Sequence, residues 1–182
     1  MKRASWIFAI FLLFFTGCTL DNSNMDSLTP THADSEYIFE SYDELCDFVK
    51  DDERLNPYRD KSGAVTIYTM NADDETVLSA IRTVSYGSYF AYTYTNSDGD
   101  SIYFIWQPTE NADKYLQSSL SNYNTQPNSK DDFYYQAISI DDVPYWQIEW
   151  VEDGQYFISQ IPNIGGKAEP IRPSVKSILV QP

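Results

Sequence analysis

The sequence predicts an α+β fold, in which an antiparallel sheet of two meanders packs against two or three helices. Two blocks of short runs rich in β-branched and aromatic residues, at 64–107 and 133–161, indicate the strands. A segment with helical spacing of apolar residues precedes each block, at 42–53 and at 109–123. Turn signals that contain glycine separate neighbouring strands, so antiparallel pairing is expected.

The first helix is expected over about 42–53. Ser41 and Glu44 have the S-x-x-E spacing of a capping box, in which each side chain satisfies a backbone N–H of the first turn. Three apolar side chains then recur on one helical face: Leu45, Phe48 and Val49. The second helix, at 109–123, carries a longer stripe of the same kind, and a loop at 124–132 follows it.

Four strands are expected in the first block: 64–70, 76–85, 88–95 and 101–107. Asp98-Gly99 is a hairpin signal between the last two, and Gly87 separates the pair before them. Alternation in the third strand places Phe90, Tyr92 and Tyr94 on one face.

Three strands are expected in the second block: 133–140, 144–152 and 155–161. Asp153-Gly154 predicts a two-residue hairpin that sets Trp150 opposite Phe157. One face then carries Trp146, Ile148, Trp150 and Phe157 and is the expected core side. The other face carries Tyr145, Gln147, Glu149 and Tyr156. The tail at 165–182 is ambiguous, and a short helix that starts at Pro173 and carries Val175, Ile178 and Leu179 is one reading of it.

The N-terminus has the features of an export signal. Lys2 and Arg3 precede ten uncharged residues at 6–15, which is shorter than the ~20 apolar residues of a membrane-spanning helix. The stretch F-T-G-C that ends at Cys18 resembles the lipobox of bacterial lipoproteins. That resemblance implies a diacylglyceryl group on the Cys18 thiol and cleavage before it. The alternative is an ordinary secretory signal with an incidental cysteine.

The predicted organisation is a signal peptide at 1–17, the lipidated Cys18 with a flexible polar tether at 18–36, and one globular domain at 37–182. Without the leader, ten Lys and Arg stand against 27 Asp and Glu, a formal balance of −17. Such a surface repels phosphate backbones and anionic headgroups, so nucleic-acid partners are not expected. The membrane is expected as a partner only through the lipid anchor, on the extracytoplasmic face.

The predicted domain lacks the residues that most catalytic and metal-binding sites require. The one histidine, His32, lies in the tether, so the domain offers no Ser-His or Cys-His pair and no zinc site of the usual kind. Cys46 is the only cysteine of the domain and is expected to be a small buried apolar residue. Asn96, Asp98 and Asp100 have calcium-loop spacing, but the later ligands are missing, and a turn is the better reading. No metal, no cofactor and no enzymatic activity are expected.

The high tyrosine content is the unusual feature, with 15 Tyr in the chain. Four tyrosines on the outward strand faces form a candidate platform for a sugar or peptide: Tyr89, Tyr103, Tyr145 and Tyr156. Ordinary cross-strand packing is the alternative. Glu149 lies on the same predicted face, where it is expected to be solvated.

The second hairpin resembles the closing hairpin of small lipoprotein domains of Gram-positive-type bacteria. Trp150, Asp153, Gly154 and Phe157 carry this likeness, which implies no activity. The expected function is a non-enzymatic binding or sensing domain tethered in the cell envelope, with an envelope protein or glycan as partner. The alternatives are a lipid-anchored carbohydrate-active enzyme that uses paired carboxylates and a structural envelope protein.

Overall fold

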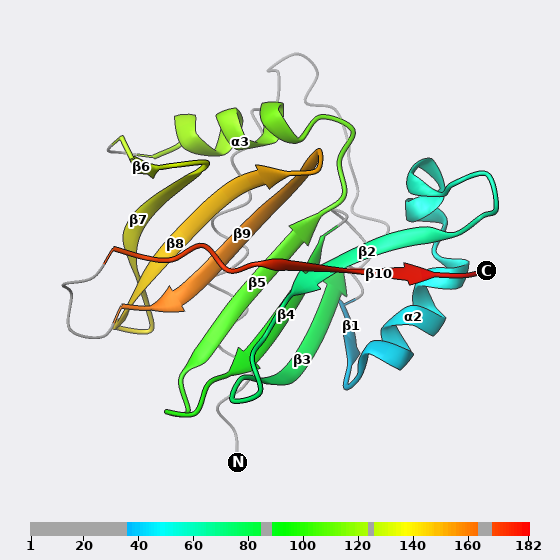
Figure 1. Cartoon of the computed structure of the whole chain (residues 1–182), viewed down its shortest axis with the longest axis horizontal. Coiled ribbons are helices and arrows are strands. Elements are labelled where there is room, and N and C mark those ends of the chain that lie inside the picture. The colour runs from blue at the N-terminus through cyan, green and yellow to red at the C-terminus, as the bar shows by residue number, and fades with distance from the viewer. Residues whose placement is uncertain (1–35, 85–88, 124–125, 164–168) are drawn as a thin grey trace, which may run out of the picture.

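The computed structural model describes residues 36–84, 89–123, 126–163 and 169–182 (Figure 1). The predicted signal peptide, Cys18, most of the tether and Gly87 lie outside the described residues. None of the helices in the described ranges is long and apolar enough to cross a bilayer.

An eight-stranded antiparallel sheet forms the centre of the domain. Its order is β1-β3-β4-β5-β9-β8-β7-β6, so two meanders, β3–β4–β5 and β7–β8–β9, join where β5 pairs with β9. The predicted α+β class is therefore confirmed. The strands are β1 (Glu36–Phe39), β3 (Val77–Val84), β4 (Phe90–Thr95), β5 (Ser101–Gln107), β6 (Asn128–Lys130), β7 (Phe133–Ile140), β8 (Val143–Glu152) and β9 (Gln155–Pro162).

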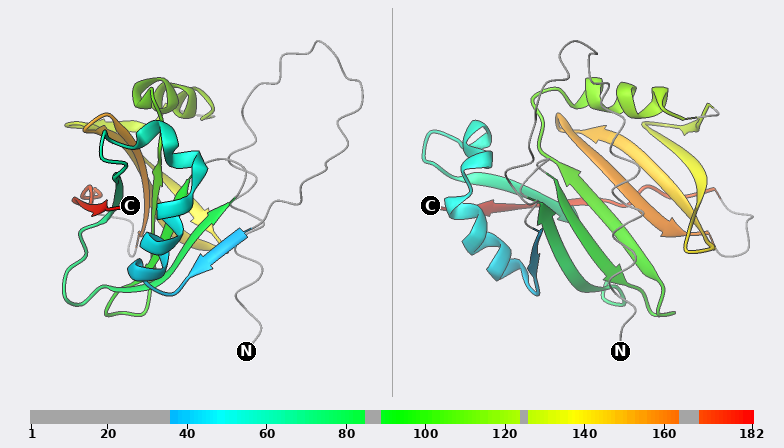
Figure 2. Two further views of the ribbon diagram at one scale, coloured as in Figure 1. Left: turned by 90° about the vertical axis from the view of Figure 1, so that its right-hand side faces the viewer. Right: turned by 180° about the vertical axis from the view of Figure 1, so that it is seen from behind.

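Two further layers cover this sheet. On one face lie α2 (Tyr42–Asp51) and a two-stranded sheet of β2 (Val65–Met70) and β10 (Val175–Val180), which crosses the large sheet in Figure 1. On the other face α3 (Ala112–Ser121) packs against β8 and β9 along the upper end of the strands (Figure 2). A short 3₁₀ helix, η1 (Glu53–Tyr58), continues the chain after α2.

The main core lies between the large sheet and the layer of α2, β2 and β10. Trp150 and Phe157 are opposite each other in the β8–β9 hairpin, as predicted, and their rings stack with centroids 5.3 Å apart. Phe90 and Trp106 stack in the same way at 5.1 Å. Fully burying an apolar side chain of this class stabilises the fold by roughly 1.5–3 kcal/mol, so these rings are the main stabilising residues.

A second, smaller core lies on the opposite sheet face. Ile105 and Ile158 alternate along their strands with the main-core residues and pack instead against Ala112 and Leu116 of α3. Both faces of the central strands are therefore buried. The face that alternation predicts to be outward is covered over the part that α3 reaches.

The structure resolves the ambiguous tail, and three elements differ from the sequence-based expectation. The tail at 175–180 is a strand and not a short helix, because it pairs along its whole length with β2. For the same reason β2 belongs to this small sheet and not to the first meander. The loop at 124–132 contains the short edge strand β6. The first helix ends two residues early, where the Asp52 side chain caps η1 by accepting from the Arg54 N–H.

Candidate functional site

The four platform tyrosines share the α3 face of the large sheet but do not form one exposed surface. Tyr156 is 3% exposed and lies beneath α3, where the Tyr115 ring is 6.4 Å away. Tyr145 is 6% exposed, and its ring lies 5.9 Å from that of Tyr103. Tyr89 packs against the smaller core. Of these four, Tyr103 and Tyr145 lie together as a ring pair.

Glu149 is buried, with 1% of its surface exposed, and the expectation that it is solvated is wrong. The reason is α3, which covers the end of β8. The Tyr156 hydroxyl donates to Oε2 of Glu149 at 2.7 Å, and the Gln147 amide donates to Oε1 at 2.8 Å. Burial raises the Glu149 pKa, while hydrogen bonds from Tyr156 and Ser119 oppose that shift.

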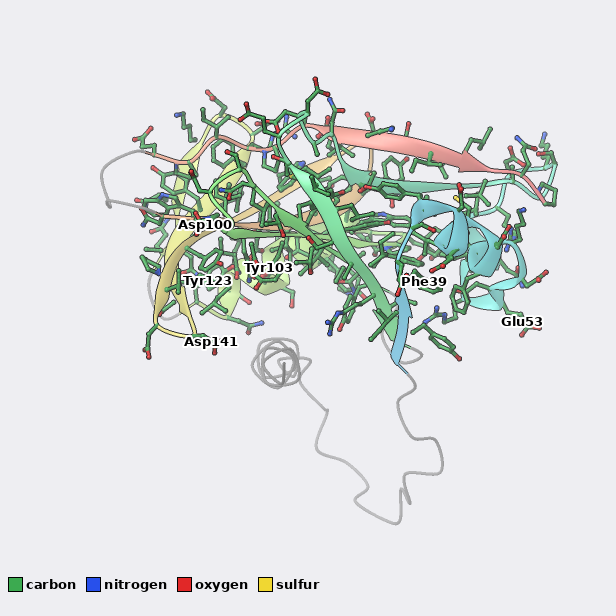
Figure 3. The ribbon with its side chains drawn as sticks, turned by 90° about the horizontal axis from the view of Figure 1, so that it is seen from below. Phe39, Glu53, Asp100, Tyr103, Tyr123 and Asp141 are labelled. Carbon is green, nitrogen blue, oxygen red and sulfur yellow. The ribbon has the colours of Figure 1, made fainter. Side chains whose placement is uncertain are left out.

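Three glutamines lie side by side across the sheet, and two of them, Gln147 and Gln160, continue this network. Gln136, Gln147 and Gln160 are consecutive cross-strand neighbours on β7, β8 and β9, and we call them the glutamine row. Gln160 Nε2 donates to Gln147 Oε1 at 3.0 Å, and Gln147 Nε2 also donates to the Tyr123 hydroxyl at 2.7 Å. Tyr103 is the next cross-strand neighbour of Gln160, on β5. Figure 3 shows Tyr103 and Tyr123 on the side of the large sheet opposite to β2 and β10.

Gln160 has an uncompensated polar atom. Gln160 is only 6% exposed, and the Oε1 atom of its side-chain amide has no hydrogen-bond partner among the described residues. An unsatisfied buried acceptor costs about 1–3 kcal/mol, so such atoms are uncommon in folded proteins. The atom has essentially no exposed surface, so a donor from outside the domain could reach it only after neighbouring side chains move.

A slight hollow lies at the β7–β8 end of the glutamine row, and it has no room for a water molecule. The residues that line it are Tyr123, Pro127, Tyr134, Tyr135, Gln136, Gln147 and Glu149. Pockets for whole small-molecule ligands are typically ~300–1,000 Å³. The side chains therefore fill this part of the sheet face.

The acidic groups of the described residues show no cluster suited to a metal ion, and Glu149 is engaged by hydrogen bonds. No group of three or more His, Cys, Asp or Glu side chains there could hold a metal ion. Both Glu149 oxygens are occupied by donors, and no second carboxyl group is among the causes of its pKa shift. In the 96–100 turn, Asn96 Oδ1 accepts from the backbone N–H groups of Asp98 and Asp100, as expected of a turn.

Cys46 is half-buried beside the main core. Burial and the nearby charges of Asp43 and Asp47 raise the pKa of its thiol. A raised pKa keeps the thiol protonated and poorly nucleophilic, which agrees with a packing role.

Sequence reasoning missed the glutamine row, although the hairpin register could have revealed it. The two-residue Asp153-Gly154 loop that pairs Trp150 with Phe157 also pairs Gln147 with Gln160. The coverage of Glu149 by α3 has no such local signal. The chain matches no protein-family model, no curated protein and no solved structure.

Proposed function

We propose that this protein is a lipid-anchored, non-enzymatic binding domain of the cell envelope, which holds a polar ligand over the glutamine row. The observation that carries the proposal is the buried and unpartnered Oε1 of Gln160. It lies beside Tyr103, its cross-strand neighbour, and at the end of the hydrogen bonds that join Gln160, Gln147 and Glu149. A ligand donor that reached this atom after a side-chain movement would satisfy it.

The lipobox-like leader supports the location. Acyl chains on Cys18 would hold the domain at the extracytoplasmic face of the membrane, since each buried methylene contributes ~0.8 kcal/mol and two chains give lasting attachment. The formal balance of −17 after residue 17 keeps the domain off anionic headgroups and disfavours nucleic acid. An envelope glycan or envelope protein is therefore the expected partner.

The hydrogen bonds of Glu149 weigh against the carbohydrate-active enzyme. A glycosidase needs two carboxyl groups ~5–10 Å apart across the scissile bond, with one free to attack or to activate water. Glu149 accepts from Tyr156 and Gln147 instead. The remaining alternative, a structural envelope protein, would have no use for an open acceptor at Gln160.

The anchor is tested with Cys18→Ser in cells, followed by detergent phase partitioning. We expect the wild-type chain in the detergent phase and the variant in the aqueous phase. A variant that enters the detergent phase as well as wild type would remove lipid attachment from the proposal.

Binding is tested by co-sedimentation of the full-length Cys18→Ser chain with the insoluble envelope fraction of the producing organism. We expect retention, and we expect Gln160→Leu to reduce it. Gln117→Leu is the matched control, because Gln117 is an exposed glutamine on α3. Equal retention of the two glutamine variants, or no retention of the parent chain, would contradict the proposed function.

A further inference from the structure

β10 is a separable strand of the domain. It pairs with β2 along all six of its residues, and the two strands form a sheet of their own that crosses the large sheet (Figure 1). Among the described residues β10 has no other strand partner. It also follows every other described strand in chain order. β10 can therefore leave its place without drawing another strand with it.

β2 needs a strand partner of this particular sequence. Val65 and Ile67 of β2 are 1% and 0% exposed, and Val180 and Ile178 of β10 pack against the same main core. Without β10, one edge of β2 would lose its hydrogen-bond partners, and these side chains would lose their cover. An unpaired strand edge is a template for a strand from another chain. The strand that fits β2 is β10 itself, with the pattern V-x-x-I-x-V at 175–180.

Surface ion pairs hold the residues that lead into β10. Arg172 pairs with Asp132 at 3.0 Å and also with Glu152, and Lys130 pairs with Glu169 at 3.1 Å. The side chains of Asp132 and Glu169 are 60% and 63% exposed. Ion pairs of this exposed kind contribute little stability, and salt weakens them further. The attachment of this segment can therefore open without unfolding the large sheet.

The charge of the segment suits the body of a second copy. Residues 169–180 carry Arg172 and Lys176 against Glu169, a formal balance of +1. Residues 36–163 carry seven Lys and Arg against 23 Asp and Glu, a formal balance of −16. The acidic body of one copy therefore attracts the cationic segment of another as it attracts its own. Two whole copies repel each other, so salt is needed to let them approach.

The chain between the two last strands is long enough for an exchange. β9 ends at Pro162 and β10 begins at Val175, so residues 163–174 join them. At ~3.3 Å per extended residue, this connection can reach about 40 Å. Two copies that exchange their segments form two identical interfaces about a twofold axis. Each contact that a segment gives up on its own body is regained on the partner.

We propose that residues 169–180 are exchanged between two copies of this chain, so that β10 of each copy pairs with β2 of the other. Release of the ion pairs of Arg172 is the opening step. The dimer repeats the β2–β10 register and these ion pairs across chains. The proposal goes beyond the proposed binding function and does not depend on it.

Disulfide trapping across chains tests the exchange. Leu179 lies opposite Thr66 in the β2–β10 register, and directly opposed strand residues have Cα separations that allow a disulfide. Two full-length chains, each with Cys18→Ser and Cys46→Ala, are prepared. One carries Thr66→Cys, and the other carries Leu179→Cys and a tag that changes its size. They are mixed in about 300 mM NaCl, which screens the repulsion between copies, and are then oxidised.

We expect a disulfide-linked pair that contains one chain of each kind. The control mixture replaces Thr66→Cys with Val77→Cys, because Val77 is 63% exposed but lies on β3, opposite Thr95. Thiols held within one complex meet at an effective concentration of about millimolar, so the yield should exceed the control by at least about tenfold. A single chain that carries both Thr66→Cys and Leu179→Cys should close within itself, which shows that both variants fold in register.

The opening step is tested with Arg172→Gln, by size-exclusion chromatography with light scattering. The ion pairs break on opening and form again in the dimer, so the variant should reach the dimer about fivefold faster, with the same dimer fraction at equilibrium. Lys114→Gln, at an exposed site on α3, is the control and should leave the rate unchanged.

Three outcomes would overturn the exchange. The first is a chain that stays monomeric at every protein concentration in about 300 mM NaCl. The second is a yield across chains no higher than that with Val77→Cys, while the double variant closes within itself. In that case any dimer joins at another edge. The third is an Arg172→Gln chain that dimerises no faster than wild type, since the opening step would then be wrong.

Discussion

The burial of the Glu149 carboxyl group makes the stability of the domain depend on pH. The native pKa is raised by burial under α3, with Tyr156 from β9, Tyr134 from β7 and Ser119 from α3 around it. The native state then binds more protons than the unfolded chain between the two pKa values. The associated stability is complete below the unfolded value of about 4.3 and is lost as pH rises through the raised native value.

Urea unfolding of wild type and Glu149→Gln at several pH values tests this. We expect the free energy of unfolding of wild type, relative to the variant, to fall with rising pH by at most ~1.4 kcal/mol per pH unit. Asp60→Asn is the opposite case, because hydrogen bonds from Ser62 lower the Asp60 pKa. Wild type is expected to be more stable than Asp60→Asn at pH values above the unfolded-state pKa of Asp. This difference in stability should disappear as pH falls. A flat difference for Glu149→Gln would contradict the burial account.

At Gln160, a substitution is expected to change binding while it changes the stability of the domain only slightly. Gln160→Leu removes an unsatisfied acceptor, which is favourable, and one hydrogen bond to Gln147, which is unfavourable. We expect the free energy of unfolding to change by less than about 1.5 kcal/mol. Ile148→Ala, at a fully buried site on the next strand, should cost about 2–5 kcal/mol. Chemical denaturation measures both, and a loss at Gln160 as large as at Ile148 would mark Gln160 as a structural residue.

Among the elements, β10 contains neighbouring residues with opposite surroundings. Val180 is 3% exposed and packs into the main core, whereas Leu179 is 57% exposed. Val180→Asp is expected to destabilise the domain by several kcal/mol, because it buries an unpaired charge. Leu179→Asp should change stability by about 0.5 kcal/mol or less. Thermal unfolding followed by circular dichroism measures both changes. On a helix, positions 175, 178 and 179 would share the buried face, so the small effect expected at Leu179 distinguishes the strand from a helix.

The elements also show where sequence reasoning succeeds. Strand alternation and the Asp153-Gly154 turn are local signals, and they gave the β8–β9 register and the core side of Trp150 correctly. The capping residues of α2 were equally local, since Ser41 accepts from the Glu44 N–H. These features depend on neighbours within a few residues, where periodicity and turn chemistry decide the outcome.

The errors concern contacts between distant parts of the chain. Nothing near residue 175 indicates that β2, about a hundred residues earlier, is its partner. Likewise, the stripe on α3 predicts a helix with one apolar face but not which sheet face it covers. The burial of Glu149 follows from that choice, so the candidate site could be predicted only in part, through the Gln147–Gln160 register.

At the scale of the whole molecule, the acidic balance opposes compaction. Residues 18–182 carry a formal balance of −17, which produces self-repulsion that the unfolded chain relieves by expanding. Raising NaCl from 10 mM to 300 mM shortens the Debye length from about 30 Å to below 8 Å. We therefore expect the midpoint of thermal unfolding to rise over this range. An unchanged or lower midpoint would show that specific ion pairs, such as that of Arg172 with Asp132, outweigh the net charge.

The pairing of β2 with β10 has a consequence for how the protein is made. Ile67 and Val65 on β2 remain without their strand neighbours until Ile178 and Val180 have been synthesised. Contacts of such long sequence separation form late, because their loop-closure entropy must be overcome first. Nearly the entire polypeptide must therefore be synthesised before the sandwich closes, and until then a chaperone or a protease can reach the unpaired β2 strand.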